Sequence, residues 1–112
     1  MKILEEAIEK SDLKNSEYTL EDGMVKAVVD IDKGIIGIDA EMHADIEQEL
    51  LKNGSNQDDL WGINLWFDAP SEDFIEFDSM INIRPRQGNR SRDVENPTTR
   101  EQIKEVVGRW IK

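Results

Sequence analysis

The feature that most constrains the fold of this chain is the strict alternation of side chains over residues 60–67. An alternation with a period of two is typical of a β-strand, because successive side chains of a strand point to opposite faces. One face of this segment carries Trp61, Ile63, Leu65 and Phe67, and the other carries Leu60, Gly62, Asn64 and Trp66. The segment therefore predicts a strand with a strongly apolar face.

Two further segments, residues 24–31 and 35–39, are predicted to pair as a hairpin. Alternate positions of the first are apolar, and Lys26 and Asp30 fall on its other face. The intervening Asp32-Lys33-Gly34 favours a turn, since glycine accepts a positive φ. Residues 74–84 also alternate and predict the longest strand, which Pro85 would end.

Helical spacing occurs in two places. Residues 41–53 place apolar side chains four positions apart and are followed by Gly54, a typical residue after a helix end. In the C-terminal segment, Asn96 and Pro97 form a helix start, and apolar side chains then recur with helical spacing. These residues are Ile103, Val106, Val107, Trp110 and Ile111.

The N-terminal third is less regular. Residues 1–8 fit either a short helix or an edge strand, and Ser11 resembles a helix N-cap, with Gly23 as the end of that helix. The predicted order of hairpins and helices indicates an α+β fold. We expect an antiparallel sheet of four or five strands, helices packed mainly on one face, and an amphipathic C-terminal helix.

Composition limits the class of protein. A chain of 112 residues with 38% hydrophobic and 35% charged residues suits one globular domain spanning residues 1–112. It contains no cysteine, so disulfides and cysteine-ligated zinc are excluded. The N-terminus lacks the apolar run of a signal peptide, and no segment is apolar enough to span a bilayer, so we expect a cytoplasmic protein.

Charge is distributed unevenly along the chain. The net charge is −11, which disfavours nucleic acid and anionic membrane surfaces as partners. Residues 1–83 contain six lysines, no arginine and 21 acidic residues, whereas residues 84–112 contain eight basic and four acidic residues. The last quarter of the chain is therefore the place to look for a site that takes an anion.

The first candidate site is the segment RPRQGNRSR, residues 84–92. Its arginines could hold a phosphate or a carboxylate, because guanidinium groups bind such anions with two parallel hydrogen bonds. We expect Arg84, Arg90 and Arg92, together with Asn89, to bind a small anionic ligand or an acidic protein segment. The alternative is that these arginines pair internally with the acidic remainder of the chain.

The second candidate is a divalent-metal site, which would make the chain a divalent-metal-binding protein or a metal-dependent enzyme that uses carboxylates of the sheet. Glu76 and Asp78 would share the polar face of the last strand, with oxygen ligands that suit Mg²⁺ or Ca²⁺. The only histidine, His43, lies near Asp45 and could add a ligand. The alternatives are a solvated sheet face and an ordinary acidic first turn of a helix.

Other signals are weaker. Trp66 falls on the face opposite Trp61 and could anchor a partner protein, unless a helix covers it. The chain has no phosphate-binding Gly-Lys loop, no dinucleotide glycine fingerprint, no nucleophile elbow and no paired-histidine zinc motif. The sequence therefore identifies no cofactor and no reaction, and it leaves the oligomeric state open.

Several segments resemble an uncharacterised family of small bacterial and archaeal proteins, a domain of unknown function. They are MVKAVVDIDKGIIGI, HADIEQELLKNGS, DLWGINLW, EFDSMINIRP and QGNRSR, followed by the terminal helix, and they cover about residues 24–111. The resemblance implies a compact, intracellular, single-domain protein. It implies no activity, substrate or catalytic residue.

Overall fold

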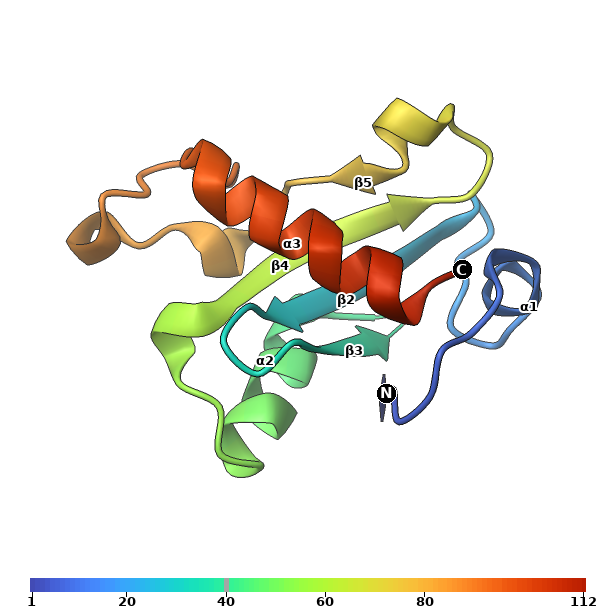
Figure 1. Cartoon of the computed structure of the whole chain (residues 1–112), viewed down its shortest axis with the longest axis horizontal. Coiled ribbons are helices and arrows are strands. Elements are labelled where there is room, and N and C mark those ends of the chain that lie inside the picture. Colours follow the sequence, from blue (N-terminus) through green and yellow to red (C-terminus); the bar gives the residue numbers. More distant parts are fainter. Residues whose placement is uncertain (40) are drawn as a thin grey trace.

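The computed structural model describes residues 1–39 and 41–112, and a five-stranded antiparallel sheet forms its centre (Figure 1). The strand order in space is β1-β3-β2-β4-β5. In chain order the strands are β1 Lys2–Ile3, β2 Met24–Asp30, β3 Ile35–Asp39, β4 Leu60–Trp66 and β5 Ile75–Glu76. The α+β prediction is confirmed, and the ambiguous N-terminal segment contributes an edge strand to the sheet.

Three α-helices pack on this sheet: α1 Lys10–Lys14, α2 His43–Lys52 and α3 Pro97–Trp110. Figure 1 shows α3 lying across one face and α2 behind the other. We expected the helices to pack mainly on one face of the sheet. Helices α1 and α3 contribute to the cluster on one face, and α2 packs on the opposite face. Within the described residues, no helix has both the length and the apolarity required to cross a membrane.

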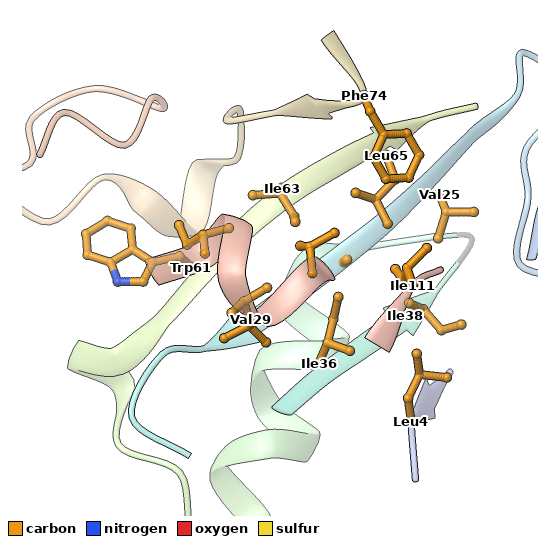
Figure 2. Packing of buried hydrophobic residues seen from close by; sticks show 14 of the residues in the cluster. Leu4, Val25, Val29, Ile36, Ile38, Trp61, Ile63, Leu65, Phe74 and Ile111 are labelled. Atoms are coloured by element: carbon orange, nitrogen blue, oxygen red, sulfur yellow. The ribbon is translucent and has the colours of Figure 1, made fainter. Parts of the chain in front are cut away.

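Both faces of the sheet are apolar, which explains why helices cover both. The larger cluster lies under α3 (Figure 2). It also includes Leu13 of α1. The smaller cluster lies between α2 and the sheet, where Ile46 and Leu50 of the helix pack on Val28 and Leu60. Gly37 allows α2 to approach closely, because a Cβ there would lie 2.5 Å from Cγ2 of Ile46. The alternation of apolar residues in the sequence predicted the larger cluster. The smaller cluster was harder to predict, because its strand residues are single apolar residues on faces that also carry polar ones.

The prediction of a long strand over residues 74–84 is wrong. Only Ile75–Glu76 pairs with β4, and Met80–Asn82 forms a 3-10 turn. The hydroxyl of Ser79 caps this turn by accepting a hydrogen bond from the Ile81 N–H, at 3.3 Å. A serine side chain that bonds a nearby main-chain N–H competes with the hydrogen bonds between strands. Here the bond between Ser79 and the Ile81 N–H forms, and the strand ends.

Side chains replace the missing strand along the edge of β4. The carboxamide of Asn82 accepts from the Gly62 N–H at 2.8 Å and donates to the Gly62 carbonyl at 2.9 Å. Arg84 donates to the Leu60 carbonyl at the same edge. Because unpaired main-chain groups at a sheet edge invite association with other chains, these contacts close an otherwise open edge.

The C-terminal helix forms as predicted, and the first helix does not. The side chain of Asn96 accepts from the Thr98 N–H at 2.8 Å, which makes it the N-cap of α3. Helix α1 spans only five residues, with Glu9 as its N-cap, and ends well before Gly23. Residues 11–23 contain several poor helix formers, and Leu13 is the one buried side chain of α1.

Candidate functional site

A row of polar residues crosses the sheet beside the first turn of α2. Asp39, Lys26, Asn64 and Glu76 are successive cross-strand partners in β3, β2, β4 and β5. The next row under α2, formed by Gly37, Val28 and Gly62, is apolar or without side chains. The helix therefore covers the apolar row, and the polar row remains at the point where the helix begins.

A cavity of about 210 Å³ lies at this point. Its wall comes from four parts of the chain, and the residues that matter for its chemistry are Lys26, Met42, His43, Ser79, Met80 and Arg92. Three of these side chains are basic, and two are methionines, 55% and 67% exposed. The start of α2 contributes the positive end of its helix dipole. Its N-cap residue, Met42, makes no side-chain hydrogen bond to the N–H groups of the first turn.

His43 is the best-defined side chain of this cavity. Its Nε2–H donates to the Ile63 carbonyl at 2.7 Å, which leaves Nδ1 as the acceptor nitrogen of the neutral ring. Burial lowers the pKa of His43, and the Ile63 carbonyl offsets part of that effect. Nearby Lys26 lowers the pKa further, and Asp78 raises it. The ring is therefore neutral at pH 7, and a bound anion would favour its protonation.

The two other basic groups each make one side-chain contact with the described residues. Lys26 donates from Nζ to the Glu41 carbonyl at 2.6 Å. Arg92 donates from Nε to Oδ1 of Asp78 at 2.5 Å, and both side chains of this ion pair are about half exposed, 54% and 41%. These contacts leave further N–H donors on both cations, since a guanidinium has five and an ammonium three.

Arg84 and Asn89, by contrast, serve the fold of the arginine-rich segment. Arg84 donates to the carbonyls of Ile81 and Gln57, at 3.0 and 2.7 Å, and its guanidinium lies 4.5 Å from the ring centre of Trp61. Burial lowers the pKa of Arg84. Buried Asn89 donates to the carbonyls of its own loop, at residues 82, 91 and 93. Neither side chain lines the cavity at α2, so the structure does not gather the four predicted anion-binding residues at one place.

The main chain of the same segment already holds an anionic group, the carboxylate of Glu95. Its Oε2 accepts from the Ser91 hydroxyl at 2.7 Å and from the N–H groups of Arg90 and Ser91, at 3.0 and 2.9 Å. These bonds, first of all that of the Ser91 hydroxyl, lower the pKa of Glu95. The Arg90 guanidinium is exposed and donates no hydrogen bond to a described residue.

The predicted metal ligands lie at separate points. Glu76 accepts from Asn64 and Trp66, at 2.8 and 3.1 Å, Asp78 pairs with Arg92, and Asp45 is exposed in the first turn of α2. Within the described residues, no three His, Asp or Glu side chains gather in an arrangement that could hold a metal ion. Of the other three predicted ligands, Asp78 approaches His43 closely enough to influence its pKa.

Of the six residues that determine the chemistry of the cavity, sequence reasoning identified His43 and Arg92 and missed four, Lys26, Ser79, Met42 and Met80. Lys26 is the one basic residue of β2, and its partner in β4 is Asn64, which the sequence placed on the face opposite Trp61. A correct prediction of the pairing between β2 and β4 would have placed Lys26 beside Asn64. The sequence does not specify which strands pair. Trp66, the predicted partner anchor, is partly buried and donates to Glu76 on the same face.

Comparison with known proteins adds one result. No curated protein matches this chain, and no solved structure does. A family model described as "Protein of unknown function (DUF5674)" matches residues 2–110. Because the match covers nearly the whole chain, the protein belongs to this family.

Proposed function

We propose that this protein is a binding module for a small anion, which it takes into the cavity at the start of α2. The observation that carries the proposal is the convergence of two cationic side chains, Lys26 and Arg92, with the titratable His43, from separate segments of a strongly acidic chain. The uncapped first turn of α2 adds main-chain N–H groups and a favourable dipole.

The exposed methionines indicate what else the ligand carries. Met42 and Met80 flank the cationic cavity and are mostly exposed. Methionine is flexible and adapts to apolar groups of varied shape. We therefore expect a phosphate or carboxylate with an apolar substituent to bind more tightly than the bare anion.

The decisive experiment is calorimetric titration with inorganic phosphate, phenyl phosphate and benzoate. Replacing Arg92 by Gln removes a charge-assisted hydrogen bond, so affinity should fall by roughly tenfold or more. Arg86→Gln is the matched control, because Arg86 is an exposed arginine of the same segment outside this cavity. Comparison of phenyl phosphate with benzoate distinguishes the two kinds of anion.

A second variant separates binding from structure. Asp78→Asn breaks the same ion pair as Arg92→Gln but leaves the guanidinium in place. If Arg92 binds the ligand, Asp78→Asn should retain or increase affinity while Arg92→Gln loses it. Equal losses in both variants would mean that the ion pair only maintains the fold, and no saturable heat with any of the three anions would refute the proposal.

A further inference from the structure

We propose a second binding site, independent of the first, for a neutral hydroxyl-rich small molecule such as a sugar or polyol. It is a cavity of about 520 Å³ between the arginine-rich segment and the start of α3. This volume lies within the range of about 300–1,000 Å³ that is usual for small-molecule sites. The wall residues that determine its chemistry are Trp61, Gln87, Glu95, Asn96 and Thr99.

Trp61 provides the observation that points to a ligand. The residue is 5% exposed, and its indole nitrogen is buried without a hydrogen-bond partner among the described residues. Trp66 and Trp110 donate to Glu76 and to the Gly34 carbonyl, at 3.1 and 2.7 Å. A buried donor without an acceptor is costly and rare in native proteins. Figure 2 places the indole at one end of the core cluster, beyond Ile63 and Val29.

The first turn of α3 supplies a second donor. The Thr98 N–H is bonded to the Asn96 side chain, the Arg100 N–H to the Asn96 carbonyl, and Pro97 has no N–H. The amide of Thr99 remains, and it has no acceptor within the helix. Thr99 lines the cavity and also carries a hydroxyl. The Thr99 amide is therefore a donor at the cavity, at the positive end of a 14-residue helix, and the buried Trp61 N–H is a second donor that a ligand oxygen can reach once the wall shifts.

The charge of the wall selects a neutral ligand. Glu95 is the one ionisable residue that lines the cavity, and its carboxylate is kept ionised by the Ser91 hydroxyl and by two main-chain N–H groups. An anion would be repelled by Glu95, whereas a hydroxyl could donate to its second oxygen. Arg84 stacks on the indole, but four of its five N–H groups are already bonded to carbonyl oxygens of Ile81, Gln57, Leu60 and the Gln87 side chain. A molecule with several hydroxyls satisfies both the donors and the acceptor.

The buried position of the indole nitrogen has a consequence for binding. A ligand oxygen reaches the nitrogen only if a neighbouring side chain of the wall moves slightly. We therefore expect the indole N–H signal to change in both position and linewidth when the site is filled. Such a change is measurable because the three tryptophans give three separate indole signals.

The test is a ¹H–¹⁵N correlation spectrum of the intact protein, titrated with glucose, ribose and glycerol. The Trp61 signal, assigned by its absence in Trp61→Phe, should move saturably, and the Trp66 and Trp110 signals should stay in place. Trp61→Phe keeps an aromatic ring and should weaken sugar binding at least tenfold, whereas Trp66→Phe should not.

Three results would overturn the inference. They are no saturable movement with any of these compounds, equal movement of all three indole signals, and unchanged affinity in Trp61→Phe. Inorganic phosphate provides the test of charge: if it moves the Trp61 signal as strongly as a sugar does, the ligand is not neutral. Arg92→Gln, which affects only the other cavity, should leave sugar binding unchanged, so failure of one proposal does not decide the other.

Discussion

Asn82 is a single side chain that takes the place of a strand. It is fully buried, and its carboxamide makes two hydrogen bonds with Gly62 and one with the Arg92 carbonyl at 3.0 Å. Asn82→Ala leaves these main-chain groups unpaired in a buried site, so we expect the free energy of unfolding to fall by about 3 kcal/mol. Urea unfolding measures this.

The control for this prediction is Asn53→Ala, which removes an exposed asparagine bonded to its own helix. Its effect should stay within about 0.5 kcal/mol. If the two alanine variants differ by less than about 1 kcal/mol, water replaces the carboxamide at the edge of β4, and Asn82 does not hold that edge closed.

Two glycines should respond to alanine in opposite directions. A Cβ at Gly62 would lie 2.6 Å from both Cβ and Oγ of Ser79, so Gly62→Ala should destabilise the protein by about 1–3 kcal/mol. Nothing lies within 4 Å of a Cβ at Gly108, inside α3, so Gly108→Ala should stabilise it by about 0.5–1 kcal/mol. Thermal unfolding of both variants tests the pair. A neutral Gly62→Ala would show that the Ser79 turn is free to move away from β4.

At the scale of elements, the start of α2 should make stability depend on pH. The pKa of His43 is lowered by burial, so between that pKa and about 6.5 the unfolded chain binds more protons than the folded one. Stability therefore falls as the pH drops through this window and is fully present above about 6.5. The charged groups near the ring are Lys26, Asp78 and Arg92.

His43→Gln should remove this dependence while retaining a donor for the Ile63 carbonyl. We expect the wild-type protein to lose more stability than the variant between about pH 7.5 and 5.5, measured by urea unfolding. Equal losses would assign the pH dependence to other groups. At the same low pH, a protonated His43 should also strengthen anion binding, which calorimetry can check.

The elements that the sequence predicted well are those in which one pattern dominates. β2, β3, β4 and the α3 start follow directly from alternation, a turn glycine and an Asn-Pro cap. Residues 74–84 alternate equally well, yet the segment turns at Ser79. Periodicity reports which side chains are apolar, but it does not report that Ser79 and Asn82 will compete for the main-chain bonds.

The candidate site could be predicted only in part, for a similar reason. Arg92 and His43 were visible as unusual residues, but their common cavity depends on which strands pair and on where α2 begins. Arg84 looked equivalent to Arg92 in the sequence. Three of its four hydrogen-bond partners are main-chain carbonyls, at residues 57, 60 and 81, and a sequence does not indicate which main-chain carbonyls a side chain will reach.

At the scale of the whole molecule, the basic end of the chain contacts the rest of the protein mostly through carbonyl oxygens and aromatic rings, and among the described residues one ion pair joins it to the acidic part. Arg92 pairs with Asp78, Arg84 caps the edge of β4, and Arg100 lies 4.5 Å from the ring centre of Phe77. The ion pairs of the described residues nevertheless join partly exposed groups, which contribute little each. The net charge of −11 therefore remains a largely uncompensated repulsion.

This balance predicts that salt stabilises the protein. At about 0.01 M ionic strength the Debye length is about 30 Å, larger than the radius of gyration of 12.8 Å, so all acidic groups repel one another. At about 1 M the Debye length falls to about 3 Å. We expect the melting temperature to rise by about 5 °C between these conditions, which corresponds to about 1 kcal/mol for a domain of this size.

Neutralising two exposed acids tests the cause of the salt effect. Glu5 and Glu6 lie on the acidic N-terminal segment, and Glu5→Gln/Glu6→Gln should raise the melting temperature at low salt and reduce its increase with salt. Differential scanning calorimetry at several NaCl concentrations measures both. A melting temperature that falls as salt is added would mean that the arginine contacts, rather than the excess of carboxylates, dominate the electrostatic free energy of folding.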